Sequence, residues 1–228
     1  MKQRVSPGEL CAEYLGSMFL VLAAIAPTIF FVYILESSIG LAILANAIAV
    51  AFVLMALIEV FGPVSGAHFN PLVSLIMALE KKIQPQKAIL FLLMQIAGGI
   101  SGLVLTHLMF WEEKGVLFSL SENVRRYAYL GEVLGTFILI LAILMLLKGR
   151  SSHVPMMVAF LVGGQIMATS STMFANPQVT IARMFTSSTA GIRPLDGLVF
   201  IGMQLIGALL AYAVYKLIFA KNKAMLEE

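Results

Sequence analysis

Six apolar runs, each long enough to cross a lipid bilayer, constrain the fold of this chain more than any other feature. They cover roughly residues 9–34, 40–61, 86–110, 128–147, 154–173 and 196–219. A helix of about 20 residues spans a hydrocarbon core of about 30 Å. Charged residues make up 12% of the 228 residues, whereas soluble domains carry about 25%. We therefore predict an all-α, multi-pass membrane protein with one domain, 1–228.

Composition also argues against several function classes. The net charge of +3, with no basic patch, indicates no nucleic-acid partner. A single cysteine, Cys11, has no partner for a disulfide within the chain. The spans hold no nucleophile–base pair and no cluster with metal-ligand spacing, so we expect no enzyme, no metal and no cofactor. His68 is accordingly expected to structure its loop, and the basic N-terminus is interpreted as leading into the first span.

Two further apolar segments, 70–80 and 176–186, are too short to cross the membrane, and each begins with Asn-Pro. Asparagine is a good helix N-cap, and proline is tolerated at the first helical position. Asn70-Pro71 and Asn176-Pro177 therefore predict helix starts. About ten helical residues rise about 15 Å, half of the hydrocarbon core. Both segments are predicted to be re-entrant half-helices.

The chain also contains an internal repeat. CAEYLGSMFLVLAAI (11–25) matches LGEVLGTFILILAIL (130–144), FNPLVSL (69–75) matches ANPQVTI (175–181), and LMQIAGG (93–99) matches GMQLIGA (202–208). The matches pair Glu13 with Glu132, Asn70 with Asn176, and Gln95 with Gln204. Each half, 1–126 and 127–228, holds three spans and one half-helix. Because three is odd, the second half enters from the opposite side, and the repeat is predicted to be inverted.

In an inverted repeat, the two half-helices meet near the midplane with their N-termini facing. Each N-terminus carries about half an elementary positive charge, so the pair forms a barrier to cations and protons. The Asn side-chain oxygens cap the helices, which leaves the amide NH2 donors for a passing solute. The arrangement predicts a pore that passes neutral molecules and excludes ions.

The segments that lead into the half-helices, 62–68 and 169–175, are rich in glycine and hydroxyl residues and are not expected to be helical throughout. Irregular backbone at membrane depth is tolerated where it lines a cavity. We expect backbone carbonyls of these segments to face the pore, namely those of Gly66, Ala67, His68, Phe174 and Ala175. The buried carboxylates of Glu13 and Glu132 are expected to accept hydrogen bonds from backbone N–H groups of the same loops.

The lysines and arginines predict the orientation. Ten lie on the side that holds both termini: Lys2, Arg4, Lys81, Lys82, Lys87, Lys148, Arg150, Lys216, Lys221 and Lys223. Four lie on the other side: Lys114, Arg125, Arg126 and Arg193. By the positive-inside rule, both termini are expected to be cytoplasmic, in a plasma or inner membrane.

These motifs resemble the aquaporin and aquaglyceroporin (major intrinsic protein) family over essentially the whole chain. The resemblance rests on AEYLG and GEVLG, on SGAHFNPLV and FANPQVT, and on the two glutamines. It implies an hourglass fold and a homotetramer with one pore in each protomer. The small-residue pairs Gly98/Gly102 and Gly131/Gly135 are expected to allow the close helix packing that such an assembly needs.

The sequence departs from the pattern of that family at positions that bear on the solute. The usual Asn-Pro-Ala triplets read Asn70-Pro71-Leu72 and Asn176-Pro177-Gln178. The filter arginine of the family, three residues after the second asparagine, is replaced by Val179. By the same resemblance, the other filter positions are Val50, Gly164 and Met173. We expect a filter that is wider and less polar than that of a water pore, unless Met173 folds across it.

The resemblance therefore implies a passive channel for small uncharged solutes, such as glycerol and other polyols, urea, arsenous acid or methylated arsenicals, with some water. The segments NPQVTIAR and AGIRP resemble a bacterial branch implicated in arsenical efflux. Two alternatives stay open, a narrow water-selective pore and a weak-acid or anion channel of the formate–nitrite type.

Arg183, one helical turn beyond Val179, has two possible roles. Helical side chains lean toward the N-terminus of their helix, so a long arginine could reach back to the vacated filter position. Alternatively, Arg183 sits in the last turn, complements the helix dipole and extends to the membrane interface.

Overall fold

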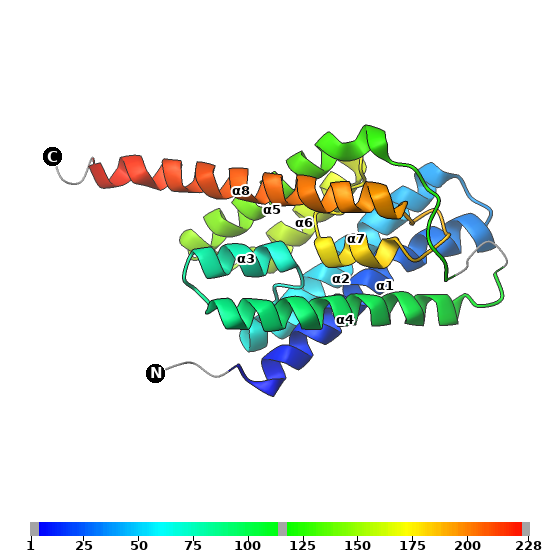
Figure 1. Cartoon of the computed structure of the whole chain (residues 1–228), viewed down its shortest axis with the longest axis horizontal. Coiled ribbons are helices and arrows are strands. Elements are labelled where there is room, and N and C mark those ends of the chain that lie inside the picture. Colours follow the sequence, from blue (N-terminus) through cyan, green and yellow to red (C-terminus); the bar gives the residue numbers. More distant parts are fainter. Residues whose placement is uncertain (1–4, 114–117, 225–228) are drawn as a thin grey trace.

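A computed structural model describes residues 5–113 and 118–224, with side chains as far as Phe219. All regular structure in this part is helical (Figure 1). The elements are α1 (Pro7–Ile29), the π-helical turn η1 (Phe30–Ile34), α2 (Ile39–Ser65), α3 (Pro71–Leu79), α4 (Pro85–Met109), the 3-10 turn η2 (Arg126–Ala128), α5 (Tyr129–Lys148), α6 (Val154–Ala168), α7 (Pro177–Arg183) and α8 (Pro194–Ala224). Lys2, Arg4 and Lys114, and the side chains of Lys221 and Lys223, lie outside the described residues.

The long helices α1, α2, α4, α5, α6 and α8 pack into a bundle. The start of α1 and the end of α8 lie toward the same end of it (Figure 1). In the described part, five helical segments are long and apolar enough to span a membrane. The sixth expected span, 154–173, is too long, because α6 has 15 residues and ends at Ala168. Its end is set by hydroxyl groups that compete for backbone hydrogen bonds. The Thr169 hydroxyl donates to the Gln165 carbonyl at 2.8 Å and accepts from the Met173 N–H at 2.9 Å.

The half-helices α3 and α7 lie end to end in the middle of the bundle (Figure 1). Helix α3 has nine residues and α7 has seven, so the predicted segment 176–186 is too long. The helix stops because loops take its last carbonyls. The N–H of Ile192 donates to the Arg183 carbonyl at 3.0 Å, and that of Ser121 donates to the Met184 carbonyl at 2.9 Å.

Helix α1 carries a proline inside the membrane span. Pro27 has no N–H, so the carbonyl of Ala23, four residues earlier, loses its helical donor. The helix continues past the proline and then loosens into η1, Phe30–Ile34. A polar acceptor is thereby left at membrane depth, where it needs another partner.

Glycines bring α4 and α1 into close contact. A Cβ atom on Gly98 would lie 2.2 Å from the Tyr14 carbonyl oxygen, and one on Gly102 would lie 2.1 Å from that of Met18. The other expected pair is also used within the chain, since Gly131 faces the loop after α6 and Gly135 faces Met173. Both glycine pairs were expected to serve packing between protomers, whereas the structure uses them for contacts within the chain.

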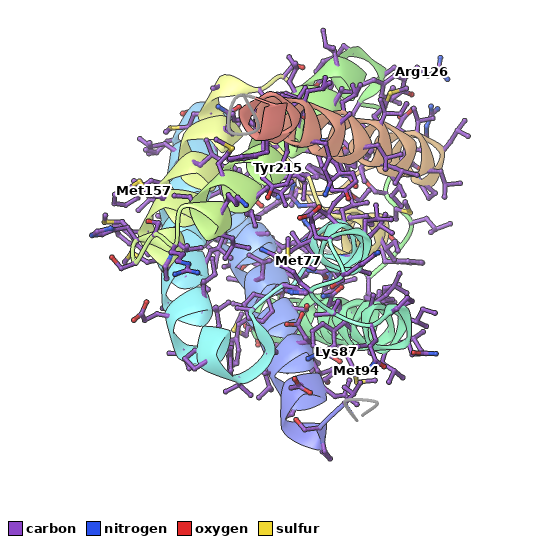
Figure 2. All side chains as sticks on the ribbon, turned by 90° about the vertical axis from the view of Figure 1, so that its left-hand side faces the viewer. Met77, Lys87, Met94, Arg126, Met157 and Tyr215 are labelled. Atoms are coloured by element: carbon purple, nitrogen blue, oxygen red, sulfur yellow. The ribbon has the colours of Figure 1, made fainter. Side chains whose placement is uncertain are left out.

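Apolar side chains fill the bundle and also cover its outside. One buried cluster joins α3 to α5 and α8 and includes Met77 and Tyr215. In the end-on view of Figure 2, Met77 lies in the interior, whereas Met157 and Arg126 lie at the periphery. Large apolar residues such as Phe52 and Leu217 are more than half exposed on the outside. This is the pattern of a helical bundle whose surrounding solvent is lipid.

Replacing Gly102 with alanine tests the α1–α4 contact. The added methyl group would overlap the Met18 backbone, and overpacking of this kind costs roughly 1–3 kcal/mol. We expect Gly102→Ala to lower the thermal unfolding temperature in detergent. Gly202→Ala is the matched control, because a Cβ there meets no atom within 4 Å. Equal unfolding temperatures for the two variants would contradict the packing described.

Candidate functional site at the half-helix junction

The two Asn-Pro motifs meet and bind each other's loops. The Asn70 side-chain oxygen caps α3 by accepting from the Leu72 N–H at 2.9 Å, and Asn176 caps α7 by accepting from that of Gln178 at 3.2 Å. Asn70 Nδ2 donates to the Ala175 carbonyl at 2.8 Å. One N–H of its amide is therefore committed to the partner loop, and one remains for a solute.

Asn176 mirrors this contact in the other half of the chain. Its Nδ2 donates to the Phe69 carbonyl, also at 2.8 Å. The expectation that both donors of each asparagine are free was therefore wrong for one hydrogen of each. Both asparagines line a central cavity of about 340 Å³.

The residues that follow Asn-Pro point away from this cavity. Gln178 is buried, its Nε2 donates to the Phe69 carbonyl at 3.2 Å, and its Oε1 lies against Gly99 of α4. Leu72 belongs to the apolar cluster that joins α3 to α5 and α8. Neither side chain lines the cavity. The two departures from Asn-Pro-Ala therefore alter helix packing and do not change the walls of the pore.

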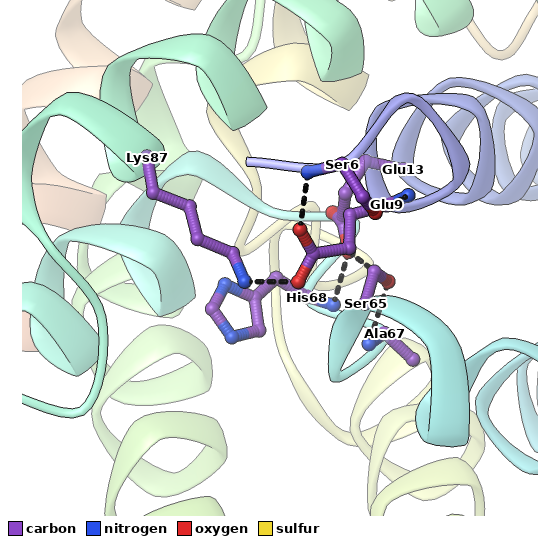
Figure 3. Close-up of polar contacts among 7 residues, drawn as sticks. All are labelled: Ser6, Glu9, Glu13, Ser65, Ala67, His68 and Lys87. Carbon is purple, nitrogen blue, oxygen red and sulfur yellow. Dashed lines mark hydrogen bonds and ion pairs between the residues drawn. The ribbon is translucent and has the colours of Figure 1, made fainter. Parts of the chain in front are cut away.

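A buried carboxylate holds each loop. Glu13 is fully buried and accepts from the N–H groups of His68 at 3.0 Å and Phe69 at 2.8 Å. Ser65 adds a hydroxyl donor at 2.6 Å (Figure 3), and Gln95 adds an amide donor at 2.7 Å. Successive N–H groups that converge on one anion form a nest, which stabilises negative charge without a cation.

The second half repeats this arrangement. Glu132, also fully buried, accepts from the N–H groups of Phe174 and Ala175, both at 2.9 Å, and from Gln204. The two glutamines also reach the half-helices, since Gln95 donates to the Ser74 hydroxyl of α3. Gln204 donates in the same way to the hydroxyl of Thr180 in α7.

The loops share one backbone conformation. The residue before each asparagine has a positive φ, 46° at Phe69 and 47° at Ala175, and so does the residue two positions earlier, 49° at Ala67 and 42° at Met173. Such angles cost a non-glycine residue about 1–3 kcal/mol and persist only where the surroundings enforce them. Here the carboxylates, by binding consecutive N–H groups, supply that constraint.

His68 belongs to the structure of its loop. Its Nδ1 lies 2.9 Å from the Ser74 hydroxyl, and its ring packs edge-on against Phe91 at 5.4 Å between centroids. Figure 3 places the imidazole beside the ion pair of Lys87 with Glu9. Glu9 also forms the capping box of α1 with Ser6. The ring joins the loop to α3 and α4.

The central cavity meets a second cavity of about 520 Å³ on the side of the loops 118–128 and 184–193, which we call the loop-side vestibule. All five residues whose carbonyls were expected at the pore line the central cavity: Gly66, Ala67, His68, Phe174 and Ala175. The carbonyl of Ala175 is already bound by Asn70. Val50, Met173 and Val179 of the expected filter also line the central cavity.

Gly164 does not line either cavity, and its expected place in the filter is corrected. It lies on the exposed face of α6 and would meet no atom within 4 Å with a Cβ. The reason is the rotation of α6. Gly163 faces α2 so closely that a Cβ on it would lie 2.9 Å from the Ala51 Cβ, and the next residue is therefore turned away. Ile166, two positions on, lines both cavities instead.

Arg183 lines both cavities and is only 5% exposed, so it does not extend to the membrane interface. Its Nη2 donates to the Ala24 carbonyl of α1 at 2.6 Å. Its guanidinium lies over the Phe174 ring, 4.1 Å from the centroid. A cation stacked on an aromatic face and bonded to a carbonyl is held in one orientation.

Three residues at the meeting of the cavities were missed by sequence reasoning. Together with Arg183, the residues that line both are Asn46, Ile166 and Thr172. Asn46 could have been singled out, because a polar side chain inside an apolar span usually faces a cavity or a partner. Ile166 and Thr172 carry no such signal in an apolar, hydroxyl-rich segment.

Comparison with known proteins gives three findings. A family model described as "Major intrinsic protein" matches residues 1–175. Aquaglyceroporin AqpS of Rhizobium meliloti is 36% identical over 205 residues, 90% of this chain and 87% of that protein. Glycerol uptake facilitator protein 3 of Lactiplantibacillus plantarum is 34% identical over 97 residues, 38% of this chain and 40% of that protein.

A solved structure shares the fold. The X-ray structure of the aquaglyceroporin from Plasmodium falciparum matches with a TM-score of 0.66 and 18% sequence identity, covering 91% of this chain and 94% of that chain. At this identity the match supports the arrangement of the helices and nothing about the solute.

Replacing Glu132 with glutamine tests the role of the buried carboxylate. The amide keeps the size but loses one acceptor oxygen, so a loop N–H is left unpaired at a cost of roughly 1–3 kcal/mol. We expect a lower unfolding temperature in detergent. Glu59→Gln, at an exposed position on α2, is the control and is expected to leave the temperature unchanged. A Glu132→Gln protein as stable as wild type would show that the nest does not hold the loop.

Proposed function

The chain belongs to the major intrinsic protein family and is a membrane channel for small solutes, and we propose that its cargo is uncharged. The solutes would be glycerol and similar polyols, urea, and arsenous acid or methylated arsenicals, conducted passively with some water. We further propose that the chain has no catalytic activity. The single observation that carries the proposal is that the two half-helices meet at Asn70 and Asn176 and that both asparagines line the central cavity.

The junction favours neutral solutes for an electrostatic reason. The N-termini of α3 and α7 face each other at Asn70 and Asn176, so two positive dipole ends act on one short stretch of the pore. The one free N–H of each asparagine offers a donor to a hydroxyl or carbonyl oxygen. A cation or a hydrated proton would meet the positive N-terminal ends of both half-helices. The amide side chains of the asparagines carry no negative charge that would offset this repulsion.

The central cavity favours small polar molecules with apolar carbon. Val50, Val179 and Met173 line it with apolar side chains, Asn70 and Asn176 line it with polar ones, and we propose that loop carbonyls add to its polar wall. A polyol has both kinds of surface, with hydroxyl groups along one edge and carbon along the other. We propose that Val50, Met173 and Val179 shape this wall, and that Glu13 and Glu132 position the loops.

The organisation of the channel is part of the same proposal. We propose two inverted repeats, 1–126 and 127–228, assembled as a homotetramer in which each protomer conducts. The lysine and arginine count supports cytoplasmic termini in a plasma or inner membrane. Apolar residues on the outside of the bundle are suited to contact either lipid or a neighbouring protomer.

Solute flux into proteoliposomes tests the proposal. Stopped-flow light scattering would compare water, glycerol, urea, arsenous acid, formate and nitrite in liposomes with and without the protein. We expect glycerol permeability well above that of empty liposomes. Water flux alone would favour the narrow water pore, flux of formate or nitrite alone would favour the weak-acid channel, and either result would overturn the proposal.

A further inference from the structure

We propose that solutes are selected at a ring of four residues, Asn46, Ile166, Thr172 and Arg183, where the central cavity meets the loop-side vestibule. The proposal rests on the channel function proposed above and names the part of the pore that sets its solute range. These four residues are the ones that line both cavities in the described part of the chain. They come from α2, α6, the loop before α7, and α7 itself.

The ring lies one helical turn from the filter that the sequence indicates. Asn46 precedes Val50 by four residues on α2, and Arg183 follows Val179 by four on α7. Helix α2 begins at the vestibule, which Ile39 lines, whereas α7 runs away from the junction toward it. Both shifts therefore go in the same direction, by about 6 Å. The expected positions and the ring are two successive levels of one pore.

Helix α1 holds the arginine in the ring. Because Pro27 has no N–H, the Ala23 carbonyl is free to accept from Asn46 Nδ2, at 3.2 Å. The same amide nitrogen lies 3.0 Å from the Ala24 carbonyl, which also accepts from Arg183. Asn46 and Arg183 thus share one anchor on α1.

The groups left over at the ring suit a slim neutral solute. Arg183 Nε is buried and has no hydrogen-bond partner in the described part of the chain, so one donor of the ring arginine is left unsatisfied. Asn46 uses its Nδ2 on α1, so its side-chain oxygen is the acceptor that it can offer. Thr172 adds a hydroxyl, which both donates and accepts, and Ile166 adds an apolar wall.

The charge at the ring excludes cations. Arg183 has no carboxylate within ion-pair distance in the described residues. A second guanidinium, that of Arg125, lies 5.6 Å from the centroid of the same Phe174 ring and lines the vestibule. A cation entering from the vestibule would meet both before reaching the half-helix dipoles.

The test compares two levels of the pore on the same two helices. Arg183→Ala and Asn46→Ala change the ring, and Val179→Ala and Val50→Ala change the cavity wall one turn away on the same helices. Each protein is reconstituted, and its permeability is measured for glycerol and for the longer polyol erythritol. Thr172→Val and Ile166→Ala provide a second pair in the ring, for use if Arg183→Ala does not give a monodisperse protein.

We expect the ring variants to raise the ratio of erythritol to glycerol permeability by about fivefold, the factor that corresponds to one ordinary hydrogen bond. Arg183→Ala should also raise sodium leak, and the Val50 and Val179 variants, which line the wider central cavity, should change both quantities less than the ring variants do. A larger change in the Val50 and Val179 variants than in the ring variants would overturn the inference. If wild type conducts no polyol, the proposed function fails instead, and the two failures are distinguishable.

Discussion

The binding of two buried carboxylates to consecutive backbone N–H groups is the interaction on which the rest of this structure depends. The loops before α3 and α7 leave the helical state inside the bundle, where lipid offers no hydrogen bonds. Glu13 and Glu132 each bind two of the loop N–H groups that have no helical acceptor. They thereby stabilise left-handed backbone angles that would otherwise be costly. Without them, neither half-helix would begin at the depth where Asn70 and Asn176 meet.

The pore that results combines several weak electrostatic devices. The half-helix dipoles act at the junction, and Arg183 acts at the ring toward the vestibule. Neither barrier requires a carboxylate or a metal, and both leave a path for a molecule without charge. Val50 and Val179 lie between the two barriers, and their apolar side chains offer no hydrogen-bonding groups to water there. Under the proposed function, exclusion of ions and passage of polyols arise from the same walls.

Much of this arrangement could be predicted from the sequence, because its parts occur twice. The pairs Glu13/Glu132 and Asn70/Asn176 stand out in an apolar chain, and proline after asparagine marks a helix start. A charged residue in a span needs a partner, and the loop N–H groups are the donors that the topology brings near. The helical fold and its membership in the family were predicted correctly.

The parts that escaped prediction depend on rotation and on contacts between distant segments. Spacing alone placed Gly164 in the filter, but Gly163 packs against α2 and turns its neighbour outward. Arg183 is anchored on the Ala24 carbonyl, 159 positions earlier in the chain, and no local pattern connects the two. The end of α6 could not be predicted either. A threonine such as Thr169 is compatible with a helix, and its sequence does not show that its hydroxyl binds the Gln165 carbonyl.

Proton flux measured together with glycerol flux tests the central claim most directly, since the facing half-helices are held to pass neutral molecules and stop charge. Proteoliposomes with an enclosed pH-sensitive dye, a potassium ionophore to clamp the potential and a pH step would report proton entry. The account predicts glycerol permeability well above that of empty liposomes and proton permeability equal to theirs. Proton entry that rises in parallel with glycerol permeability would contradict it.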